Sequence, residues 1–320
     1  MLGGGQPPPS FCFACFPHLA GRCTVPPMAI GIRTALMALG LFSSGVLLAC
    51  GQIDTPVPPM PATPELAIRG QILANGLGAC GHCHSMTGDP NEPLSGGRTM
   101  SDKFGDIQGP NITLAASGIG SWSEGDFIRT FRAYVKPNGG VVAPSFHSGV
   151  EWMSDVDLGA LTTYIRSLPA VENEVPDREI SWLDENTVGF FDSKSDVRGL
   201  VPQIPRAFRA EYGQYLVDHV AHCGSCHSQP EGIILSASYM SGGEEIYFDG
   251  EAKVAPDITS SPDSGLGEWS ESDYKTFFAT GRTRDGRQVD ARFCPVRYYS
   301  RAAPEDIDAM VTYLRTIPAD

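Results

Sequence analysis

Basic residues are in short supply in this chain of 320 residues. It carries 23 lysines and arginines against 37 aspartates and glutamates, which gives a formal net charge of −14 at pH 7. We expect no nucleic-acid partner, because phosphates would be repelled rather than neutralised. An acidic surface instead favours docking onto a basic patch of another protein. Acidity that serves only solubility is the alternative.

Long hydrophobic runs are also missing. The apolar run over residues 35–49 is too short to cross a bilayer comfortably, but it follows a short basic segment, as in an export signal. It ends in Leu-Leu-Ala-Cys at 47–50, which resembles the lipobox of bacterial lipoproteins, where the cysteine is acylated. We therefore expect a lipoprotein signal at 28–49 and lipidation of Cys50, which would anchor the exported protein on the periplasmic or extracytoplasmic face of a membrane. A plain secretory signal with a chance cysteine is the alternative.

The segments that flank this signal lack the composition of a folded core. Residues 1–27 look like neither a signal nor a domain, so we interpret them as an extension upstream of the true start at Met28. Residues 50–64 contain five prolines and few core-forming residues. Such a composition predicts a semi-rigid, extended tether.

Motifs for substrate chemistry are absent as well. The sequence contains no dinucleotide-binding fingerprint, no nucleophile elbow and no convincing pair of carboxylates. The glycines at 76, 78 and 81 form no ordered phosphate loop ahead of a helix. We therefore assign no catalytic residue.

One short pattern does occur, and it occurs twice. Residues 80–84 are Cys-Gly-His-Cys-His and residues 223–227 are Cys-Gly-Ser-Cys-His. This spacing is typical of c-type haem attachment, in which the cysteines form thioethers and the histidine binds the iron. A zinc or redox C-x-x-C is the alternative for a single match, and the second copy disfavours it. We predict two haem c groups, with attachment and iron-binding residues Cys80, Cys83, Cys223, Cys226, His84 and His227.

An internal repeat surrounds both patterns. Four segments, 70–73, 110–113, 118–124 and 157–169, recur at 213–216, 256–259, 265–271 and 306–318. Apolar residues at helical spacing, with Ser123 and Ser270 as N-cap candidates, predict mainly helices in both copies. The repeat therefore predicts two domains, 65–170 and 207–320, joined by a linker over 171–206.

Residues 65–320 resemble tandem class I cytochromes c, such as the cytochrome subunits of membrane-associated alcohol, aldehyde and sugar-acid dehydrogenases. The shared features are the two haem signatures, the Ile-Thr block with its following Trp-Ser, and the closing Tyr-x-Arg-Ser-Leu-Pro. The resemblance implies an all-α fold of two cytochrome c domains, each built around one covalently attached haem. It also implies electron transfer as the activity, with a quinone-linked or oxidase-linked partner.

The sequence departs from this family at the second iron ligand. The resemblance implies a methionine before a proline, whose sulfur stabilises ferrous iron, but Ala143 stands there in the first module. The nearby candidates are His147 and Met153. His147 would give bis-histidine ligation and a lower potential, and a surface loop histidine is its alternative. Met153 has packing as its alternative.

In the second module Cys294 occupies the expected methionine position. We predict that it binds the second iron as a thiolate, which would hold ferric iron and lower the potential. An inert buried cysteine is the alternative. His82 and His222 neighbour residues already directed at haem, so we expect both to face solvent.

These features predict an exported, lipid-anchored dihaem cytochrome c. It would carry single electrons between a periplasmic or membrane redox enzyme and a downstream acceptor. One alternative is a dihaem enzyme similar to peroxidases or to thiosulfate dehydrogenases, a group known for a His/Cys haem. The missing methionines keep this alternative open, whereas the repeated Ile-Thr and Trp-Ser blocks favour the carrier. Another is a fixed electron-wiring subunit of a respiratory or photosynthetic complex.

Overall fold

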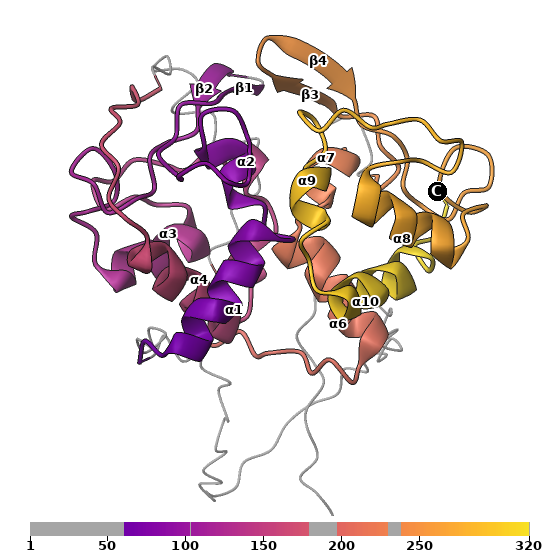
Figure 1. The fold of residues 1–320 in the computed structure, drawn as a ribbon, viewed down its shortest axis with the longest axis horizontal. Coiled ribbons are helices and arrows are strands. Elements are labelled where there is room, and N and C mark those ends of the chain that lie inside the picture. Colours follow the sequence, from indigo (N-terminus) through magenta and orange to yellow (C-terminus); the bar gives the residue numbers. More distant parts are fainter. Residues whose placement is uncertain (1–60, 103, 179–196, 230–237, 320) are drawn as a thin grey trace, which may run out of the picture. The chain divides into compact units, whose positions relative to one another are not determined.

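The computed structural model describes residues 61–102, 104–178, 197–229 and 238–319 (Figure 1). The expected extension over 1–27, the expected signal, Cys50, most of the tether and the middle of the linker lie outside these ranges. The described residues all belong to one compact unit, 51–320. None of the helices described within it has the length and apolar character to cross a membrane.

The first module begins with a helix that its sequence caps well. Thr63 accepts a hydrogen bond from the Leu66 amide, and Pro64 occupies the first turn, where its missing N–H is harmless. This helix packs along the last helix of the module. The elements in chain order are α1 (Pro64–Asn75), α2 (Cys80–His84), β1 (Thr99–Asp102), β2 (Gly105–Gln108), α3 (Glu124–Ala133), η1 (Pro144–Phe146), η2 (Val150–Trp152) and α4 (Asp155–Ser167).

The second module repeats this order of elements. Its last helix packs on its first, as in the first module. Its first helix ends in a single π-helical turn, a feature that is frequent at functional sites. The elements are α6 (Arg209–Tyr215), η3 (Leu216–Val220, the π turn), α7 (Gly224–His227), β3 (Glu245–Phe248), β4 (Glu251–Val254), α8 (Glu271–Thr280), α9 (Val296–Tyr299) and α10 (Pro304–Leu314).

A four-stranded antiparallel sheet joins the two modules, in the order β2-β1-β3-β4 (Figure 1). Each module supplies one hairpin, and Met100 of β1 pairs with Phe248 of β3. The β3–β4 hairpin turns at Asp249-Gly250, both with positive φ, as a two-residue primed turn requires. The all-α expectation is therefore not confirmed: the described residues form helices and a small antiparallel sheet.

A buried polar network links the modules through matching positions of the repeat. Arg69 donates to Asp157 at 2.8 Å, while Tyr212, which stands where Arg69 does in the first copy, donates to Asp306 at 3.0 Å. Arg69 also lies 3.6 Å from Asp306 and 3.4 Å from the Tyr212 hydroxyl. Both aspartates are buried, and each has partners in both modules or at their boundary. The apolar core around them is likewise continuous across the two modules.

Candidate haem sites

Each haem signature lies on a short helix, and its histidine is held in the same way in both modules. The His84 Nδ1 lies 2.8 Å from the Pro110 carbonyl oxygen, and the His227 Nδ1 lies 2.8 Å from that of Pro256. A carbonyl oxygen can only accept, so Nδ1 carries the proton and Nε2 keeps its lone pair free. This is the usual arrangement behind a metal-binding histidine.

Sequence reasoning used Pro110 and Pro256 only as markers of the repeat and missed this role. The prolines are 26 and 29 residues away from the histidines that they hold. The sequence did mark these positions, because both prolines begin matching blocks of the internal repeat. A contact across such a separation does not follow from local periodicity.

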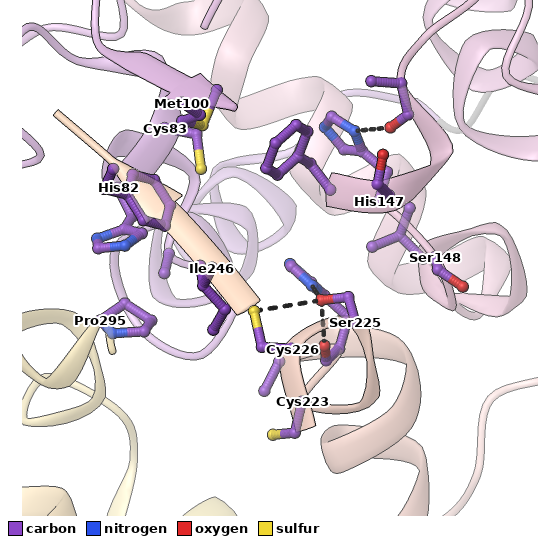
Figure 2. Close-up of a pocket in the computed structure, with 18 of the residues that line it drawn as sticks. His82, Cys83, Met100, His147, Ser148, Cys223, Ser225, Cys226, Ile246 and Pro295 are labelled. Atoms are coloured by element: carbon purple, nitrogen blue, oxygen red, sulfur yellow. Dashed lines mark hydrogen bonds between the residues drawn. The ribbon is translucent and has the colours of Figure 1, made fainter. Parts of the chain in front are cut away.

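The four signature cysteines are free thiols, and they line a common cavity of about 3320 Å³. Figure 2 shows the side chains of Cys83, Cys223 and Cys226 around it. Burial raises the pKa of Cys83 to about 12 and that of Cys226 to about 11. The cavity is several times larger than the ~300–1,000 Å³ of a usual small-molecule pocket.

The walls of this cavity suit flat, apolar groups. Both modules contribute large apolar side chains, and Trp122 and Trp269 stand at matching positions. No cluster of three or more His, Cys, Asp or Glu side chains suited to a metal ion occurs among the described residues. Haem iron needs only axial ligands from the protein, because the porphyrin supplies the others. The thiols, the free Nε2 atoms and the apolar walls therefore fit two haem c groups.

In the first module the structure brings His147 close to His84. The two ring centres are 6.1 Å apart, with the rings tilted by 46°. His147 is partly buried and lines the cavity (Figure 2). Met153 is 2 % exposed, and it belongs to the apolar core as well as to the cavity wall.

In the second module Cys294 lines the same cavity as Cys223 and Cys226. Its amide donates to the Asp290 carbonyl at 3.3 Å, in the turn that leads into α9. Burial, and to a smaller degree the nearby Cys226, raises the pKa of the Cys294 thiol to about 12. In the absence of a metal this group is thus a neutral thiol.

The expectation that His82 faces solvent is wrong. It is only 6 % exposed, and its ring packs edge-on against Phe248 and Tyr298 of the second module, with centres 5.0 and 6.3 Å apart. Arg98 lies beside it, with Nη1 2.5 Å from the His82 carbonyl oxygen. The second module covers the first signature at this point. No local sequence pattern predicts this contact between the modules. His222 is half-buried, with Nδ1 3.0 Å from the Ser225 hydroxyl.

The chain matches no protein-family model, but it is similar to several characterised cytochromes. It is 28 % identical over 281 residues to the fructose dehydrogenase cytochrome subunit of Gluconobacter japonicus, covering 82 % of this chain and 55 % of the relative. It is 30 % identical over 285 residues to the cytochrome c subunit of a quinone alcohol dehydrogenase of Gluconobacter oxydans, covering 81 % and 56 %. A diheme cytochrome c-type protein of Cereibacter sphaeroides is 26 % identical over 278 residues, covering 82 % and 91 %.

The chain spans just over half the length of these two dehydrogenase subunits and most of the diheme cytochrome. The similar region includes about four-fifths of the chain. The chain is therefore a homologue of cytochrome c subunits of fructose and alcohol dehydrogenases and of a diheme cytochrome c.

Proposed function

We propose that this protein is a dihaem cytochrome c that transfers single electrons. The observation that carries the proposal is the duplicated proximal geometry: in each module the signature histidine donates a hydrogen bond from Nδ1 to a proline carbonyl and keeps the lone pair of Nε2 free. The signature cysteines of both modules lie as free thiols around one cavity. When bound, haem supplies the one-electron chemistry, and the chain supplies attachment, ligands and a water-poor surrounding.

Cys294 is the proposed second ligand of the second haem. Three features support this: its place at the family's methionine position, its exposure to the cavity and its closeness to Cys226. A thiolate donor would stabilise ferric iron and lower the potential relative to methionine. The two haem sites would then differ in ligation although their proximal sides match.

The partner is proposed to be a redox enzyme on the extracytoplasmic side of a membrane. Relatives are named as subunits of fructose and alcohol dehydrogenases, which favours a place in an enzyme complex over a freely diffusing carrier. The net charge of −14 suits a basic docking patch on that partner. Acylation at Cys50 would hold the protein on the membrane surface.

The test is to produce the chain with the haem-attachment machinery and to measure its intact mass and metal content. We expect the mass of two haem groups and two irons per chain. The double variant Cys80→Ala/Cys83→Ala should lose one haem, and Cys223→Ala/Cys226→Ala should lose the other. A chain that carries zinc and no haem would contradict the proposal.

A further inference from the structure

His147 is oriented for metal binding in the same way as the two signature histidines. Its Nδ1 lies 3.2 Å from the Ala143 carbonyl oxygen, which leaves Nε2 without the proton. His84 is held through Nδ1 by Pro110 at 2.8 Å. Two imidazoles in one cavity therefore both keep a lone pair on Nε2. The haem signature of the first module accounts for only one of them, His84.

The separation of the two rings matches what one iron between them would need. Their centres lie 6.1 Å apart. At the ~2.0–2.1 Å of a zinc–imidazole nitrogen bond, a metal ion bound by both Nε2 atoms from opposite sides would require ring centres roughly 6 Å apart. We propose that His147 is the second axial ligand of the first haem, so that this haem is ligated by two histidines. This inference rests on the proposed function.

The loop that carries His147 is held from both modules. The Tyr134 hydroxyl, at the end of α3, donates to the His147 carbonyl at 2.8 Å. Two residues further on, the Gly149 carbonyl accepts from the His219 Nδ1 at 2.9 Å. Gly149 has φ 101°, and a Cβ there would lie 2.2 Å from the Asp218 carbonyl oxygen. Tyr134 and His219 are thus positioning residues, and Gly149 allows the close approach to η3.

The second module has no counterpart of His147. When Ala143 is aligned with Cys294, the position of His147 falls on Tyr298. The Tyr298 side chain is buried against the first module instead, so close that a Cβ on Gly81 would lie 2.4 Å from its hydroxyl. The proposed bis-histidine ligation therefore concerns the first haem alone.

The test compares His147→Ala with Met153→Leu, the matched control at the other candidate ligand. Ferric electron paramagnetic resonance and near-infrared magnetic circular dichroism distinguish bis-histidine from histidine–methionine ligation. We expect a bis-histidine signal in the wild type that is lost in His147→Ala, restored by added imidazole and retained in Met153→Leu. Unchanged signals in His147→Ala, or loss of the low-spin signal in Met153→Leu, would overturn the inference.

Two further measurements separate this inference from its alternatives. Intact mass should show two haems in every variant; a wild type without haem would instead refute the proposed function. His147→Met should raise the potential of one haem and leave the other unchanged, because methionine sulfur stabilises ferrous iron. His219→Ala should shift that same potential by less than His147→Met does. A potential in His219→Ala identical to that of the wild type would refute the positioning role of His219.

Discussion

At the scale of single residues, backbone carbonyls set the tautomer and the ring orientation of three histidines. His84, His147 and His227 each lie with Nδ1 at hydrogen-bond distance from a carbonyl oxygen. That bond selects the tautomer and fixes the ring before any metal arrives.

The two signature glycines should respond differently to substitution, although they occupy the same position in the repeat. In Gly81→Ala the new Cβ would lie 2.4 Å from the buried Tyr298 hydroxyl, so we expect a loss of stability of about 1–3 kcal/mol. In Gly224→Ala the nearest atom is 3.3 Å away, and we expect a change of less than about 1 kcal/mol. Urea unfolding measures both. Equal effects would refute the tight Tyr298 contact.

Replacement of the proposed thiolate gives a second prediction at this scale. Cys294→Met should raise the potential of one haem, because methionine sulfur favours the ferrous state. Redox titration followed by absorbance measures it, and His147→Met serves as the reference for the other haem. If Cys294→Met leaves both potentials unchanged, the cysteine is a packing residue.

Some of these residues were predictable from the sequence and others were not. The signature cysteines and histidines follow from a spacing of five residues that the attachment chemistry itself dictates. His147 was one of two candidates, because spacing alone does not show which side chain faces the cavity. The burial of His82 arises from Phe248 and Tyr298, which come from the other module. Only the folded chain brings those rings together.

At the scale of elements, α3 and α8 begin with the same capping box. The Asp126 amide donates to the Ser123 hydroxyl at 3.1 Å, and the Asp126 carboxylate accepts from the Ser123 amide at 3.0 Å. Ser270 and Asp273 repeat the arrangement at 3.2 and 2.8 Å. The sequence predicted both serines as N-caps, and the structure confirms them.

We expect Ser123→Ala and Ser270→Ala each to lower stability by about 1 kcal/mol, with additive effects because the helices are separate. Hydrogen bonds from each serine hold the pKa of Asp126 and of Asp273 below the ordinary value of 3.8. A lowered pKa stabilises the fold above that value, and the gain is lost as pH falls through the folded pKa. The effect of each substitution should therefore shrink below about pH 4. A pH-independent effect in urea unfolding would contradict this coupling.

The sheet is the element that the sequence reasoning missed. Asp249-Gly250, between the segments that form β3 and β4, is a strong hairpin signal. The prediction from helical periodicity did not use it. The pairing of β1 with β3 has no local signal at all, because 146 residues separate the starts of the two strands. The helices were predictable because their caps and apolar spacing lie within single segments.

At the scale of the whole molecule, the two modules are interlocked rather than simply joined. Arg98 of the first module is 1 % exposed, and its Nη2 lies 3.2 Å from Asp249 and 3.0 Å from the Arg292 carbonyl of the second. Its guanidinium also lies 4.5 Å from the centre of the Phe248 ring. Separation of the modules would therefore break the hydrogen bonds, the ion pair and the ring contact of this arginine.

Arg98→Met should lower stability by about 3 kcal/mol, because it removes hydrogen bonds of a buried charge and leaves their acceptors unpaired. The control is Arg129→Met, whose exposed arginine pairs, among the residues that the structure describes, with Asp126 on its own helix; it should cost less than about 1 kcal/mol. Urea unfolding followed by tryptophan fluorescence compares them. Similar effects of both substitutions would argue against an interlocked pair of modules.

The central claim is that one chain holds two haems whose proximal sides match and whose distal sides differ. A spectroelectrochemical titration of the wild-type protein tests it most directly. The account predicts two separate one-electron steps, both at potentials below that of a histidine–methionine cytochrome c, because neither distal position supplies methionine. Two haems that titrate together in one step at a histidine–methionine potential would contradict it.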